Sequence, residues 1–289
     1  MSTSPPLPSR VPASIHPPGR FAAPLRLARP LNCAMSVFAV LLGAWTVTRQ
    51  IPAAVLFSCL AWAALMTAGG NTLNDYADAG IDRLNHPARP IPSGQISRRT
   101  AGFLAWAELA LGLVAGSVIS LGCALIAFLM VALLIAYETA GLKKGGLPGN
   151  ITISLLTAML FIMGGAAADD PVRPASLAVL AFIATLGREI IKDIEDMGGD
   201  VSRRTWPMRV GPPKAKITAA LLLGLAVILS PLPYFFGTLD IGYLAIITVA
   251  NVAFVWTMVM LFRSPRRASR AAKLAMLAVL GAILIGLPK

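Results

Sequence analysis

Nine apolar segments follow one another along this chain, and each is about as long as a helix that crosses the hydrocarbon core of a bilayer. They lie at 30–48, 51–73, 101–120, 122–140, 150–168, 174–192, 215–236, 241–262 and 271–287. Hydrophobic residues make up 56% of the 289 residues and charged residues only 13%, which is too little polar surface for a water-soluble domain of this size. The sequence therefore predicts an all-α membrane protein with nine transmembrane helices.

The distribution of basic residues agrees with this number of spans and predicts their orientation. Nine spans place all of the 25 Lys and Arg residues on one side of the membrane, except Arg49, Arg173 and Lys289. Because cytoplasmic loops carry the excess of Lys and Arg, we expect a cytoplasmic N-terminus and an external C-terminus, in a multi-pass protein of the cell membrane. The basic excess does not form a stripe interleaved with aromatic residues, so no nucleic-acid partner is expected.

The chain divides into an arm and one membrane domain. Residues 1–20 are rich in Pro and Ser and lack apolar periodicity, which predicts a disordered N-terminal arm. Residues 21–289 form the predicted nine-helix domain. Its oligomeric state cannot be predicted from the sequence.

Two clusters of acidic residues share one spacing. The first stands at the end of the second apolar segment and consists of Asn71, Asp75, Asp78 and Asp82. At about 100° per residue, these side chains fall within roughly 60° of one another on a helix. The second stands 118 residues downstream, at the end of the sixth segment. It consists of Glu189, Asp193, Asp196 and Asp200.

Carboxylates aligned near a membrane boundary repel one another, so this arrangement is costly unless cations neutralise it. Oxygen ligands favour Mg²⁺ or Ca²⁺, and Mg²⁺ commonly combines one or two carboxylates with phosphate oxygens. The alternative is that the acidic residues only decorate solvated helix ends. Eight of the 13 acidic residues stand in these two windows, both on the predicted cytoplasmic side, which favours metal binding. Gly80, Gly198 and Gly199 precede the last aspartate of their clusters and are expected to fray the helices there.

At these residues the sequence resembles the UbiA superfamily of intramembrane prenyltransferases. The first motif of that superfamily, NDxxDxxxD, is matched by Asn74, Asp75, Asp78 and Asp82, and the second, DxxxD, by Asp196 and Asp200. Residues 86–94, which read HPARPIPSG, are similar to its RPxPSG loop. The resemblance covers essentially the whole chain after residue 20. It implies a nine-helix bundle that transfers a prenyl group from a prenyl diphosphate to a lipophilic acceptor with the help of Mg²⁺.

Within the superfamily, residues 188–196 and 146–150 most resemble the branch that adds a geranylgeranyl group to geranylgeranylglyceryl phosphate in ether-lipid synthesis. Branches that prenylate aromatic quinone precursors or make chlorophyll share the aspartates and remain alternatives. An ion-coupled transporter is the alternative from another class. Carriers place their acidic residues at the bilayer midplane, whereas both clusters here stand at the ends of their segments.

The resemblance assigns roles to the acidic clusters and to two asparagines. The expected metal ligands, direct or through water, are Asp75, Asp78, Asp82, Asp193, Asp196 and Asp200. Asn71 and Asn74 are expected to support them, but Asn74 lies off the stripe of Asn71, so only one of the two is expected to face the site. Either the diphosphate or a carboxylate such as Glu189 takes the proton of an acceptor hydroxyl.

Other polar residues are candidates for substrate contacts. The candidate cations for the diphosphate are Arg89, Lys143, Arg188 and Lys192, with Lys192 also assigned to catalysis. Arg89 and Lys143 are equally explained by membrane topology alone. Tyr137 resembles a tyrosine that the superfamily places near the diphosphate, although tyrosines are common at membrane interfaces. Asn32 and Asn150 are candidates for acceptor contacts or for hydrogen bonds between helices.

Overall fold

The computed structural model of this chain describes residues 22–197 and 204–288, and within these ranges every regular element is a helix. The helices are α1 (Ala22–Ala28), α2 (Pro30–Trp45), α3 (Ala53–Asn85), α4 (Arg98–Ser117), α5 (Leu121–Thr139), the short 3₁₀ helix η1 (Leu142–Lys144), α6 (Leu147–Ala167), α7 (Ala175–Asp196), α8 (Trp206–Val210), α9 (Pro212–Leu229), α10 (Leu232–Phe235), α11 (Ile241–Arg263) and α12 (Pro265–Ile285). The predicted arm at 1–20 lies outside the described residues.

In the described part of the chain, seven helices are long and apolar enough to span a membrane. An eighth span is formed if α1 and α2, which meet at an angle of 48°, count as one bent segment. The 22-residue helix α7 is long enough as well, but its charged residues keep it out of this count. The prediction of an all-α protein with many membrane spans is thus confirmed.

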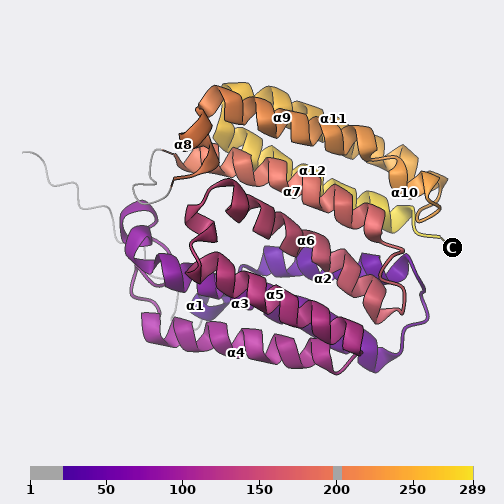
Figure 1. Cartoon of the computed structure of the whole chain (residues 1–289), viewed down its shortest axis with the longest axis horizontal. Coiled ribbons are helices and arrows are strands. Elements are labelled where there is room, and N and C mark those ends of the chain that lie inside the picture. Colours follow the sequence, from indigo (N-terminus) through magenta and orange to yellow (C-terminus); the bar gives the residue numbers. More distant parts are fainter. Residues whose placement is uncertain (1–21, 198–203, 289) are drawn as a thin grey trace, which may run out of the picture.

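The long helices run roughly lengthwise through one bundle (Figure 1). α6 is the central helix, because 72% of its most apolar window is buried, against 17–33% in the other candidate spans. It packs closely on α2, where a Cβ at Gly43 or Gly164 would collide with the backbone of the opposite helix. Small residues at such crossings allow the backbones to approach, which is the usual way that membrane helices associate.

The outer helices carry large apolar side chains on their exposed faces. Phe103 of α4 is 73% exposed, and Leu121 of α5 is 78% exposed. Such surfaces are unfavourable in water and are the ordinary outer surface of a protein in hydrocarbon. The outer faces of α4 and α5 therefore suit contact with lipid.

Two helix ends differ from the sequence prediction. α3 continues without a break to Asn85, so the expected fraying at Gly80 is wrong: one glycine costs a helix only about 1 kcal/mol, and the helix beyond it is held by side-chain contacts described below. Gly198 and Gly199 lie outside the described residues. α12 begins at Pro265, before the predicted 271, because Ser264 caps the helix by accepting a hydrogen bond from the Arg267 backbone N–H at 3.4 Å.

The alternating course of the helices places both acidic clusters at one end of the bundle. α2 and α12 begin at this end, and α3 and α7 finish there. In Figure 1 it is the end that carries α8 and the connection from α3 to α4, whereas the C-terminus lies at the other end. The ends of α3 and α7 thus lie at the same end of the bundle.

Candidate active site

A cavity of about 380 Å³ opens inside the bundle, bordered by α2, α3, α5, α6, α7, α9, α11 and α12. The charged residues that line it come from the helix ends at which the clusters stand. They are Arg29, Glu138, Arg188, Glu189, Lys192 and Lys273. Most of the remaining lining is apolar, including Met35, Phe161 and Leu280. The cavity therefore suits an amphiphilic ligand with an anionic head and a hydrocarbon chain.

The first acidic row, on α3, is neutralised by cations from other segments. Arg29 Nη2 lies 2.5 Å from Asp75 Oδ1, and Arg89 Nη1 lies 2.5 Å from Asp82 Oδ2. Arg89 Nη1 is also 3.5 Å from Asp75 Oδ1 and so joins the two carboxylates. Asp75 and Asp82 are each only 4% exposed, so the geometry of these pairs is well protected from solvent. In the structure, guanidinium groups thus neutralise this face of α3.

The third carboxylate of the row belongs to a buried network with α5. Lys143 Nζ lies 2.9 Å from Asp78 Oδ2 and 2.8 Å from Glu138 Oε2. Asn74 donates a hydrogen bond of 2.9 Å to Glu138 Oε1. The Lys143 ammonium also lies 5.7 Å from the ring centre of Tyr137. Lys143 therefore holds the ends of α3 and α5 together. A lysine that only followed the positive-inside rule would not need these contacts.

The loop after α3 is folded so that Arg89 points back to the row. Ser93 Oγ donates to the Arg89 carbonyl at 2.7 Å, and the Gln95 N–H donates to the Pro90 carbonyl at 3.0 Å. Gly94 has φ 74°, a conformation that glycine adopts without strain. The Pro-Ser-Gly sequence thus makes a tight turn that fixes the Arg89 guanidinium.

Arg29 stands at the break between α1 and α2 and is not predicted as a site residue by the sequence patterns. Its backbone is left-handed, with φ 55° and ψ 75°, and Pro30 follows it at the start of α2. A non-glycine residue in this region costs of order 1–3 kcal/mol, and such residues gather at functional sites. Asn71 donates a 2.9 Å hydrogen bond to the Ala28 carbonyl and thereby ties the break to α3. An Arg-Pro pair between two helical segments is the sequence signal that could have indicated Arg29 as a site residue.

On α7, the second cluster is held in a similar way. Glu189 is 6% exposed, and its two oxygens are taken by different cations: Arg188 Nη1 at 2.7 Å and Lys192 Nζ at 3.1 Å. Asp193 accepts a hydrogen bond of 2.9 Å from Asn150 of α6. Asp196 is the last residue of α7, and Asp200 lies outside the described residues.

The two rows fit a divalent cation that arrives together with a phosphorylated ligand. Among the described residues, no three His, Cys, Asp or Glu side chains are close enough to hold a metal ion by themselves. Mg²⁺ does not require such a cage, because it usually takes one or two carboxylates and completes its octahedron with water and phosphate oxygens. The donors present are carboxylate and amide oxygens, which are the ligands that Mg²⁺ prefers.

The structure brings some of the predicted site residues to the cavity wall and leaves others behind it. The predicted residues that line the cavity are Asn32, Asn71, Asn74, Tyr137, Arg188 and Lys192. Because both asparagines of α3 line it, the expectation that only one of them faces the site is wrong. The predicted residues held in contacts behind the wall are Asp75, Asp78, Asp82, Arg89, Lys143, Asn150 and Asp193.

Besides Arg29, sequence reasoning missed Glu138 and Lys273. Lys273 extends from α12 and donates a 2.9 Å hydrogen bond to Asn32 Oδ1 on α2. A lysine within an apolar span is a recognised signal of function, but here it falls near the end of a segment, where topology also accounts for it.

Comparison with known proteins adds to this geometry. The model of the UbiA prenyltransferase family matches residues 36–280. A digeranylgeranylglyceryl phosphate synthase of Methanothrix thermoacetophila is 38% identical over 270 residues, which cover 91% of this chain and 98% of that protein. A solved structure of digeranylgeranylglyceryl phosphate synthase in membranes superposes with a TM-score of 0.75 at 32% identity, covering 93% of this chain and 98% of that one. A UbiA homologue of Archaeoglobus fulgidus bound to GPP and Mg²⁺ shares the fold, with a TM-score of 0.67 at 19% identity over 92% of this chain and 99% of that one.

Proposed function

The chain belongs to the UbiA prenyltransferase family, and we propose that it transfers a geranylgeranyl group from geranylgeranyl diphosphate to geranylgeranylglyceryl phosphate in ether-lipid synthesis. Relatives that carry this activity in their names align with nearly the whole chain at 38% identity. The observation that carries the proposal is the cavity itself, in which a cationic end continues into an apolar interior. Two substrates with phosphate heads and long hydrocarbon chains match that division.

The two acidic rows are the proposed Mg²⁺ site. The proposed ligands, direct or through water, are Asp75, Asp78, Asp82, Asp193, Asp196 and Asp200. When bound there, Mg²⁺ stabilises the negative charge that develops on the departing diphosphate. The Archaeoglobus fulgidus homologue, which was solved with GPP and Mg²⁺, supports this use of the fold.

Cationic side chains of the chain itself supply the remaining donors for the diphosphate. Arg89, Lys143, Arg188 and Lys192 stand beside the two rows, and Arg29 joins them at the cavity wall. Each guanidinium or ammonium can form charge-assisted hydrogen bonds to phosphate oxygens. The Tyr137 ring lines the same part of the cavity and is a further proposed contact.

The transfer breaks the bond between the allylic carbon and the diphosphate oxygen and forms an ether bond to the glycerol hydroxyl oxygen. The hydroxyl proton must leave with that step. Since both oxygens of Glu189 are engaged by Arg188 and Lys192, we assign the proton to the diphosphate and treat Glu189 as a positioning residue. The apolar interior keeps water from the developing allylic cation.

We further propose that α7 is also a span, which gives nine in all, and that the site opens to the cytoplasm of the cell membrane. The support is the strong bias of Lys and Arg toward the loops at the site's end of the bundle. The charges of α7 do not oppose this, because Arg188 and Glu189 line the cavity and not the lipid face.

Purified membranes supplied with Mg²⁺ and labelled geranylgeranyl diphosphate test the proposed reaction. We expect labelled product with geranylgeranylglyceryl phosphate and none with 4-hydroxybenzoate. The label is followed by chromatography of the extracted lipids. Product from the aromatic acceptor alone would replace this proposal with that of a quinone-type prenyltransferase.

Asn150→Ala is expected to lower turnover about 10- to 100-fold, as is typical when a residue that orients a metal ligand is removed. Its amide holds Asp193, and the residue is 7% exposed. The Mg²⁺ concentration for half-maximal rate should rise, while the KM for the acceptor stays constant. The opposite pattern, a raised acceptor KM with unchanged Mg²⁺ dependence, would show that Asn150 contacts the acceptor.

A further inference from the structure

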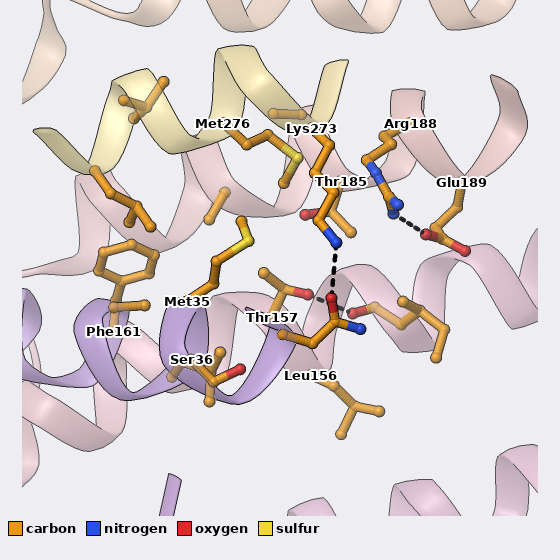
Figure 2. Close-up of a pocket in the computed structure, with 18 of the residues that line it drawn as sticks. Met35, Ser36, Leu156, Thr157, Phe161, Thr185, Arg188, Glu189, Lys273 and Met276 are labelled. Atoms are coloured by element: carbon orange, nitrogen blue, oxygen red, sulfur yellow. Dashed lines mark hydrogen bonds and ion pairs between the residues drawn. The ribbon is translucent and has the colours of Figure 1, made fainter. Parts of the chain in front are cut away.

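Lys273 is a cation that faces the cavity without a carboxylate partner. Its Nζ donates to Asn32 Oδ1 at 2.9 Å, and among the described residues no Asp or Glu lies within salt-bridge distance of it. Two further cations, Arg188 and Arg29, line the same cavity. In Figure 2, Lys273 and Arg188 extend into the same region of the cavity from α12 and α7.

This grouping is unfavourable unless an anion joins it. An ammonium within a membrane helix is costly, and two nearby guanidinium groups add repulsion. The carboxylates at this end of the cavity are already engaged: Asp75 pairs with Arg29, and Glu189 is shared by Arg188 and Lys192. Glu138 pairs with Lys143. With Lys192 included, four cations thus share two carboxylates, those of Asp75 and Glu189, and a ligand of negative charge would balance the excess.

The position of Lys273 indicates which substrate supplies that charge. α12 packs on α7, which carries the second acidic row, and on α11 and α2, whereas the first row stands on α3. The rows and the cations paired with them are assigned to the diphosphate of the donor, so Lys273, which has no carboxylate partner, is left for the second substrate. Apolar residues adjoin it on two helices, Met35 on α2 and Met276 on α12, and both are seen beside it in Figure 2.

We propose that Lys273, together with the amide of Asn32, binds the phosphate monoester of the acceptor lipid and so selects phosphorylated acceptors over phosphate-free ones. This inference rests on the proposed function. A phosphate monoester offers three oxygens, enough for the lysine ammonium and an amide N–H to bind at once. An acceptor without an anionic group would have no use for this lysine.

The test is steady-state kinetics with two acceptors, geranylgeranylglyceryl phosphate and geranylgeranylglycerol, which lacks the phosphate. For Lys273→Met we expect the KM for the phosphorylated acceptor to rise about 10- to 100-fold, the usual cost of one hydrogen bond to a charged group. The KM for geranylgeranyl diphosphate should not change, and the rate with geranylgeranylglycerol should match that of the wild type. Lys273→Arg should keep most of the affinity.

The matched control is Arg270→Gln, an exposed cation one turn earlier on the same helix, which should behave as wild type. A raised KM for the donor with an unchanged KM for the acceptor would overturn the inference and assign Lys273 to the diphosphate. So would a wild-type enzyme that uses both acceptors equally well, a result that needs no variant. A wild-type enzyme that makes no product from geranylgeranylglyceryl phosphate contradicts the proposed function instead.

Discussion

Asp75→Asn is expected to reduce turnover on the order of 1,000-fold or more, while the protein still inserts and folds. The substitution keeps the shape of the side chain and removes one negative charge from the centre of the first row. Asp75 is buried and paired with Arg29 and Arg89, so these guanidinium groups are left without a shared counter-charge. The measurement is the single-turnover rate at saturating Mg²⁺ and donor, with size-exclusion elution as the check on folding.

Asp169→Asn provides a matched control for this loss. Asp169 is exposed, follows α6 at the end of the bundle away from the site, and has φ 66°, a conformation that asparagine tolerates well. It should keep the wild-type rate. An Asp75→Asn enzyme that retains more than about a tenth of the wild-type rate would remove the first row from the proposed Mg²⁺ site.

The architecture and the rows were accessible from the sequence because each follows from a local rule. Apolar length predicts a membrane helix, and a spacing of four, three and four residues puts side chains on one face whatever the helix packs against. Asp75 and Asp82 therefore stand on one face of α3, where Arg29 and Arg89 pair with them. The helix end at Asn85 was missed because the prediction took Gly80 to be decisive, whereas contacts of Asp78 and Asp82 support the helix beyond it.

The partners of the rows were not accessible in the same way. Which cation reaches Asp75 depends on the left-handed backbone at Arg29 and on the packing of α1 against α3. Glu138 lies alone in the sequence and acquires a role only because Lys143 of η1 and Asn74 of α3 contact it in the fold. Lys273 is also explained by membrane topology, so the sequence does not separate a lysine that only sets the orientation of the protein from one that binds a ligand. The position of Lys273 at the cavity makes that distinction.

The cations that pair with the first acidic row also organise the site before substrate arrives. Arg29, Arg89 and Lys143 neutralise the first row from three different segments. The row is therefore held in place by the protein itself, so we expect that the proposed metal ion is not required for folding. Loss of metal should then lower turnover strongly and change the thermal stability of the protein only slightly.

Removal of divalent cations with EDTA is expected to lower turnover on the order of 1,000-fold or more and to shift Tm by less than about 2 °C. Added Mg²⁺ should restore the rate.

The matched variant is Lys143→Met, which leaves the buried carboxylates of Asp78 and Glu138 without their shared cation, so Mg²⁺ should now raise Tm. Lys214→Met, at an exposed position at the start of α9, should show no such dependence. Wild-type turnover that survives complete chelation would contradict metal-assisted transfer, and a wild-type Tm that falls steeply with EDTA would contradict the neutralised row.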